Sequence, residues 1–167
     1  MTPPEPTWQI VEDPDYALLW DRFDDAFSFN PMAWRERQPV IKEPDGSVTF
    51  DLGHSNDTWV VHAINALVVW ALAQVQRDQD RPLLVLDWQH PAYRFWPHRS
   101  VLYGDESPFP FQVFPFPDGD YYSFVTDDLR DGTFGHPWEP SLCVFGERLV
   151  SILRPVLTPF VPILRVA

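Results

Sequence analysis

Apolar positions recur along this chain with periods that predict helices and short strands. The first helical pattern has apolar residues three and four positions apart, at Tyr16, Leu19, Trp20, Phe23 and Phe27. An Asp-Pro pair at 13–14 supplies a cap and a first-turn proline, and the Asn-Pro pair at 30–31 stops the pattern. An amphipathic helix is therefore expected between these two pairs.

The next stretch predicts a strand, a helix and a second strand in succession. Residues 47–52 alternate between apolar and polar side chains, as in a half-buried strand. Residues 58–76 are apolar around most of the helical circumference, so this helix is expected to be central and nearly buried. Residues 83–87 begin with a continuous apolar run that is typical of an interior strand. Together the three segments predict one right-handed βαβ crossover.

The second half of the chain predicts short strands separated by proline and glycine turns. Residues 91–110 show no period, and Phe111 to Phe116 is expected as an edge strand because prolines flank it. Strands are also expected at 120–125 and 141–145. Leu149, Ile152 and Leu153 suggest a closing helix that Pro155 cuts or kinks.

The order of these elements predicts the α+β class. We expect a single domain over residues 1–167, with a mixed or antiparallel sheet that includes the βαβ unit and two to three packed helices. The ends, 1–12 and 156–167, are expected to be loosely structured.

The charge of the chain limits its partners. With 24 acidic and 12 basic residues the net charge is −12, which repels phosphate backbones and disfavours nucleic-acid binding. The same field attracts a basic partner, although acidic surfaces are also common in cytoplasmic proteins. The most apolar segment, 59–73, is shorter than the ~20 residues that span a bilayer, and no secretory signal is visible. We therefore expect a cytoplasmic protein that does not bind membranes.

Two His-Pro motifs carry the candidate chemistry, at 86–91 (LDWQHP) and 135–139 (GHPWE). Proline forces the residue before it into extended geometry, so each histidine is expected where a strand ends and turns. The candidate catalytic residues are Asp87, His90, His136 and Glu139.

Three interpretations of these motifs remain open. As metal ligands they lack a cysteine partner or an HExxH pattern, so we expect no metal and no cofactor. As acid–base groups, His90 or His136 would be the base, oriented by Asp87, Asp120 or Glu139, but no nucleophile motif or nucleotide-binding motif accompanies them. As structural residues they would only pack two strand ends. The lone cysteine, Cys143, lies in an apolar run and is expected to be a buried, inert thiol.

Aromatic residues on an acidic surface favour a function other than metal binding or catalysis, namely protein binding. The residue types that anchor interfaces are present at Trp34, Trp88, Trp96, Phe109, Tyr121 and Trp138. The predicted binding residues are Trp88, Asp120, Tyr122 and Trp138. The leading hypothesis is thus a protein-binding module for a basic protein, and the alternative is a small enzyme with a cleft built from the four candidate catalytic residues.

Three motifs in order resemble a known bacterial family. Segments 86–91 with Tyr93, 117–122 (PDGDYY) and 132–139 with 143–146 (CVFG) resemble the family catalogued as domain of unknown function 2716. The resemblance runs from about Trp20 to Leu153 and implies a bacterial, single-domain, cytoplasmic protein. It implies no activity, cofactor or catalytic residue. Small acidic proteins of this kind include immunity proteins, so the basic partner is expected to be a toxin domain that this protein neutralises, an argument from size and charge alone.

Overall fold

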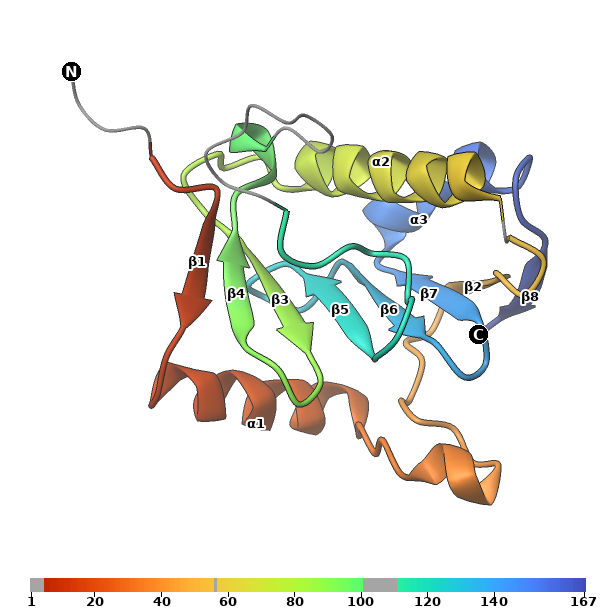
Figure 1. Ribbon diagram of the computed structural model, residues 1–167, viewed down its shortest axis with the longest axis horizontal. Helices are drawn as coiled ribbons and strands as arrows, with labels where there is room; N and C mark the ends of the chain where they lie inside the picture. Colours follow the sequence, from red (N-terminus) through yellow and green to blue (C-terminus); the bar gives the residue numbers. More distant parts are fainter. Residues whose placement is uncertain (1–4, 56, 101–110) are drawn as a thin grey trace.

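A computed structural model describes residues 5–55, 57–100 and 111–167, which form an α+β fold around one sheet (Figure 1). The described strands are β1 (Trp8–Val11), β2 (Val48–Asp51), β3 (Leu83–Asp87), β4 (Ala92–Phe95), β5 (Tyr122–Val125), β6 (Gly132–His136), β7 (Ser141–Phe145) and β8 (Ile163–Val166). The described helices are α1 (Asp15–Phe27), α2 (Thr58–Val75) and α3 (Glu147–Leu157), with 3-10 turns η1 (Ala33–Glu36) and η2 (Pro97–Arg99).

The sheet is antiparallel, in the order β1-β4-β3-β5-β6-β7-β2-β8. Because four antiparallel pairings separate β2 from β3, these two strands run in the same direction. Helix α2 connects them, so the predicted strand–helix–strand unit is present, with β5, β6 and β7 lying between its two strands.

Helices cover both faces of the sheet: α2 and α3 lie on one face and α1 on the other (Figure 1). The alternation of side chains along each strand feeds both layers. On β3, for example, Leu83 and Val85 face α2, whereas Leu84 and Leu86 face α1. The predicted alternation of β5 is confirmed in the same way, with Phe124 on the α2 side and Val125 on the α1 side.

Helix α2 is less buried than its composition predicts. Trp59 is 62% exposed and Trp70 is 48% exposed, because only one side of α2 contacts the sheet and α3. By length and composition alone, Thr58–Val75 is apolar enough to cross a membrane. In this fold the helix packs eight buried side chains, among them Ile64 and Leu72, into the core beneath it.

The expectation of loosely structured ends is corrected at both termini. Residues 8–11 form β1 beside β4, and residues 163–166 form β8 beside β2. Both are edge strands of four residues, at least half of which are exposed, and neither shows the strict alternation of apolar and polar side chains that signals a strand.

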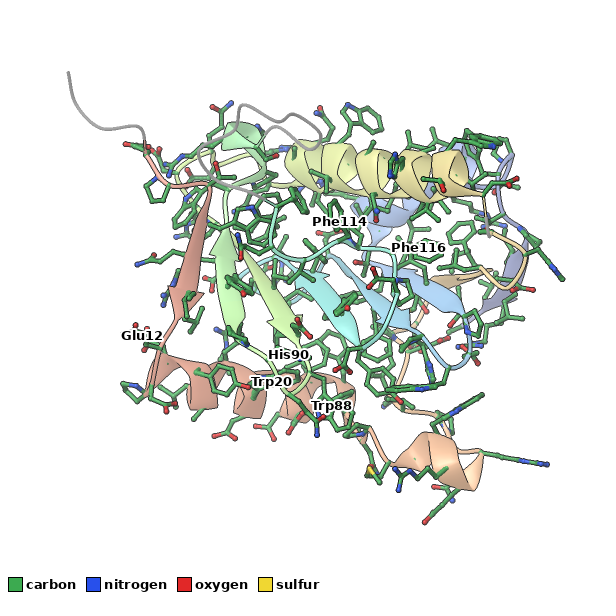
Figure 2. The ribbon with its side chains drawn as sticks, viewed as in Figure 1. Glu12, Trp20, Trp88, His90, Phe114 and Phe116 are labelled. Carbon is green, nitrogen blue, oxygen red and sulfur yellow. The ribbon has the colours of Figure 1, made fainter. Side chains whose placement is uncertain are left out.

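The proline-rich middle of the chain also differs from the prediction. Within the stretch expected to be irregular, 92–95 forms β4, and 101–110 lies outside the described residues. The edge strand expected at 111–116 is not formed. Phe114 and Phe116 instead lie on the α2 side of the sheet (Figure 2), where the Phe116 N–H donates to the buried Asn65 side chain of α2 at 2.8 Å. Proline has no backbone N–H to donate to a neighbouring strand. The Phe116 N–H is therefore satisfied by a side chain of α2 and not by a strand partner.

The closing helix is confirmed, but Pro155 does not cut it. Helix α3 continues through Pro155 to Leu157 and buries Leu149 and Leu153 against the sheet and α2. It begins after Gly146, whose φ of +90° suits glycine, and where an added Cβ would lie 2.3 Å from the Asp131 carboxylate.

Candidate functional site

The first His-Pro motif forms the tight connection between β3 and β4. Strand β3 ends at Asp87, whose carbonyl accepts a hydrogen bond from the His90 N–H at 3.1 Å. Gln89 lies between them with a φ of +67°, in the left-handed region. The Tyr16 hydroxyl of α1 donates to the His90 carbonyl at 3.3 Å, which fixes the turn against the helix. The expectation that this histidine follows a strand end is confirmed.

The turn brings His90 to two carboxylates from neighbouring strands. Its Nδ1 lies 2.9 Å from Oδ1 of Asp87 and 3.6 Å from Oδ2 of Asp120. Asp87 pairs with Tyr122 in the sheet, and Asp120 precedes Tyr122 by two residues, so both carboxylates reach the same face. The ligand atoms of this trio lie within 4.8 Å of one another, a spacing that could accommodate a metal ion. The sequence pattern expected no metal, and it did not place Asp120 with this pair as a ligand.

Negative charge dominates this cluster. Burial raises the pKa of Asp87, and the neighbouring charges of Asp120 and Asp118 raise it further against the opposing effect of His90. Burial also raises the pKa of Asp120. The hydrogen bond to Asp87 raises the pKa of the exposed His90 imidazole. Among the described residues, no arginine or lysine forms an ion pair with these three aspartates, and the His90 imidazole contacts Asp87 and Asp120.

Asp118 enters the cluster through Tyr122, a predicted binding residue. The Tyr122 hydroxyl donates to Oδ1 of Asp118 at 3.0 Å, and burial together with that carboxylate raises the tyrosine pKa. The backbone around Asp118 is held close to β6, since an added Cβ on Gly135 would lie 2.9 Å from Cβ of Pro117. The glycine of the second motif thus lets the acidic turn approach the sheet.

Aromatic residues follow the acidic ones along the chain, and their rings pack on the α1-facing side of the same strand ends. Trp88 and His90 lie at the end of β3 that points towards α1 (Figure 2). The Trp88 ring is 5.6 Å from Tyr121, and the Tyr121 ring is 4.8 Å from Trp138, which is 46% exposed. We call the surface formed by Asp87, Trp88, His90, Asp118, Asp120 and Trp138 the acidic strand-end surface.

The second His-Pro motif builds a different cluster. His136 ends β6 and is buried, and its Nδ1 accepts the Glu139 N–H at 3.0 Å. That bond places the imidazole proton on Nε2, and burial lowers the pKa of the ring, so His136 is neutral. Burial would raise the pKa of Glu139, but hydrogen bonds from Arg165 and Ser141 hold it below its usual value.

Arg165 of β8 ties this second cluster together. It donates to both oxygens of Glu139, at 2.9 Å each, and also to both oxygens of Glu43. Glu43 in turn accepts from the Thr49 hydroxyl at 3.0 Å. Neither Arg165 nor Glu43 belongs to a recognisable sequence motif, and Arg165 lies in the C-terminal segment that was expected to be loosely structured.

The four candidate catalytic residues therefore come together as two pairs. Asp87 shares the α2-facing side of β3 with Leu83 and Val85, and His90 joins it there. His136 shares the α1-facing side of β6 with Phe134, and Glu139 joins it. The alternation of side chains places the two carboxylate–imidazole pairs on opposite faces of the sheet.

The other predicted residues are scattered. Trp34 packs its ring 4.9 Å from His136, whereas Trp96 donates to the Asp80 carbonyl away from both clusters. Phe109 lies outside the described residues. Cys143 is buried, as predicted, and burial raises the pKa of its thiol to about 12.

Comparison with known proteins supports the resemblance seen in the motifs. Residues 10–150 match the family described as protein of unknown function (DUF2716). The chain belongs to this family. The DUF2716 protein is also similar to the uncharacterised protein YxiI of Bacillus subtilis (strain 168), with 27% identity over 154 residues that cover 87% of this chain and 91% of YxiI. No solved structure matches the chain.

Proposed function

We propose that this DUF2716 protein is a protein-binding module that docks a basic partner on the acidic strand-end surface. The observation that carries the proposal is the group of three carboxylates, Asp87, Asp118 and Asp120, with no arginine or lysine paired to them in the described part of the chain. Burial raises the pKa of Asp87, and the charges of Asp120 and Asp118 raise it further, so a cation from a partner would stabilise the ionised carboxylates.

The surroundings of the carboxylates suit a basic side chain of a partner protein better than a small cation from solution. Trp88 follows Asp87 in the chain, and both Trp88 and Trp138 pack on Tyr121, the residue after Asp120. An indole face attracts a guanidinium or ammonium group while covering its apolar stem, so a basic segment that crosses these strand ends would contact both kinds of residue. Strand ends hold both the aspartates and the tryptophans, so little order is lost on binding. The net charge of −12 would also speed the approach of a basic protein.

A basic toxin domain that this protein neutralises remains the specific partner we propose. A small acidic protein that covers a cationic surface would block it, and the acidic strand-end surface supplies the contact. The proposal rests on charge and surface chemistry.

The test uses a deca-arginine peptide and isothermal titration calorimetry. The variant Asp87→Asn/Asp118→Asn/Asp120→Asn keeps side-chain size and one acceptor oxygen at each position but removes three charges. We expect its affinity to fall by about tenfold or more relative to the native protein. The native affinity should also weaken when the salt concentration rises from about 0.05 to 0.5 M.

The matched control removes three charges from α1, as Asp21→Asn/Asp24→Asn/Asp25→Asn. All three side chains are exposed, so the net charge changes equally without touching the acidic strand-end surface. Equal losses in the two variants would show that net charge alone attracts the peptide, and the proposal would then be wrong. Binding of Mn²⁺ that competes with the peptide would instead favour a metal ion as the resident cation.

A second candidate function is acid–base catalysis by His90. The specific observation is the 2.9 Å contact from Asp87 to Nδ1, which orients the ring and leaves Nε2 for a substrate. In a screen of nitrophenyl esters and phosphates, His90→Gln should abolish a turnover that His54→Gln retains. If no turnover depends on His90, the catalytic function is wrong and protein binding is the remaining proposal.

A further inference from the structure

A large cleft lies on the α1 side of the sheet, beyond the end of that helix. It has a volume of about 980 Å³ and lies between the 34–43 segment and the sheet residues Phe134, His136 and Cys143. Helix α1 ends at Phe27, so the far part of this face is covered only by the segment that follows it. The Lys42 N–H donates to the Phe27 carbonyl at 2.6 Å, which holds the segment in place.

The charge of this cleft is opposite to that of the whole protein. Four cations line it, Arg35, Arg37, Lys42 and Arg165, against two carboxylates, Glu43 and Glu139. Both carboxylates are bound by Arg165. Within the described residues, Arg35, Arg37 and Lys42 form no ion pair, although the chain carries twice as many acidic as basic side chains.

Apolar and aromatic surface makes up the rest of the wall. Trp34 is 38% exposed and stands edge-on to His136 at the side of the cleft, where its ring is open to stacking. Phe134, Val40 and Ile41 line the interior. A flat apolar body fits such a wall, and its burial would contribute most of the affinity.

The cleft also contains a neutral hydrogen-bond donor. Because Nδ1 of His136 accepts the Glu139 N–H, its proton lies on Nε2, for which the described residues provide no acceptor. The Cys143 thiol in the same wall is protonated at neutral pH, since its pKa is raised to about 12. The chemistry offered is therefore reversible binding and not covalent capture.

We infer that this cleft binds an organic anion, a carboxylate, phosphate or sulfonate carried on a flat apolar body. Arg35, Arg37 and Lys42 would hold the anionic group, and Trp34 and Phe134 would contact the body. The cleft is distinct from the Asp87, Asp118 and Asp120 carboxylates, because it has the opposite charge and lies on the other face of the sheet. Trp138 of the acidic strand-end surface lies between the two, with its ring 6.3 Å from that of His136.

The test compares two fluorescent probes that differ in one charged group. Anilinonaphthalene sulfonate carries the anion, and phenylnaphthylamine is the same ring system without it. We expect the sulfonate to bind the native protein with about tenfold higher affinity than the neutral probe. In Arg35→Gln/Arg37→Gln/Lys42→Gln the two affinities should become equal, with no change for phenylnaphthylamine.

The control is Arg77→Gln/Arg81→Gln/Arg130→Gln, which removes three charges outside the cleft and should leave the sulfonate affinity within about twofold. Nuclear magnetic resonance locates the probe through the indole signal of Trp34 and confirms that each variant is folded. Equal affinity of the two probes for the native protein, equal losses in the two variants, or a probe that leaves the Trp34 signal unchanged would each overturn the inference.

Discussion

The phenol ring of Tyr121 stands edge-on to the imidazole of His136, with 5.0 Å between the ring centroids. The same ring contacts Trp138 of the second motif and Trp88 of the first. The two His-Pro motifs therefore pack on one residue although their histidines belong to separate clusters. The Tyr121 hydroxyl also donates to the Pro31 carbonyl at 3.2 Å, which connects the acidic strand-end surface to the segment that leads to the cleft.

Substitution of Tyr121 should separate the contribution of its ring from that of its hydroxyl. Tyr121→Phe removes only the hydrogen bond to Pro31 and should lower the free energy of unfolding by about 1 kcal/mol. Tyr121→Ala also removes a buried ring and should lower it by about 3–5 kcal/mol. Urea denaturation measures both. An alanine variant as stable as the phenylalanine variant would show that the ring does not join the two motifs.

His136 should make the protein less stable in mild acid. Burial holds its pKa in the folded state below the ordinary value of 6.5, so the unfolded chain takes up a proton first as the pH falls. The stability contribution is complete above pH 6.5 and is lost as the pH falls below it. His136→Asn keeps an acceptor for the Glu139 N–H and does not titrate.

The stability of native protein minus that of His136→Asn should therefore decrease between about pH 7 and pH 5 in urea titrations. Difference values that stay constant, or a His136 ring that titrates above 6.5 in nuclear magnetic resonance, would contradict the assignment.

Arg165 should stabilise the C-terminal strand through its two glutamates. Arg165→Met leaves Glu43 and Glu139 half-buried without a cation, and we expect a loss of about 1–2 kcal/mol after allowance for solvent screening. Glu139 has a pKa below its usual value in the folded state, so this contribution is present at neutral pH and is lost in acid as the carboxylate protonates.

The matched variant is Glu43→Gln/Glu139→Gln/Arg165→Met, which removes the stranded charges together with the arginine. It should recover part of the stability lost in Arg165→Met, as measured by thermal unfolding at neutral pH. No recovery would mean that the arginine acts through packing of its stem.

Gly135 should control the position of the acidic turn. In Gly135→Ala the new methyl group would lie 2.9 Å from Pro117, so the 115–120 segment must move or the sheet must yield. We expect a loss of about 1–3 kcal/mol in stability and weaker binding of deca-arginine. Gly119→Ala is the control, because its Cβ would meet only the Tyr122 hydroxyl at 3.8 Å. Equal behaviour of the two variants would exclude the role of Gly135.

Local patterns in the sequence predict much of this fold. The spacing in α1, the apolar run of β3 and the alternation of β5 are decided by which side chains face a core, and all three are found in the structure. The edge strands β1 and β8 depend on pairing with distant strands, and their own residues are half exposed. Their formation is a tertiary effect that no local period reports.

The candidate site shows the same division. The rule that a residue before proline is extended placed His90 and His136 at strand ends, where the structure has them. Which face each side chain takes depends on register, and a shift of one residue reverses it. For this reason the approach of Asp87 and Asp120 to one histidine could be seen only in the assembled sheet. The same holds for the ion pair of Glu139 with Arg165.

The most direct test of the proposed function is a nuclear magnetic resonance titration of the protein with the deca-arginine peptide. We predict that the largest shifts fall on the indole signals of Trp88 and Trp138, the His90 ring and the backbone amides from Asp118 to Tyr122. Shifts concentrated on the acidic face of α1 at Asp21, Asp24 and Asp25, with none at His90 or Trp88, would contradict the account.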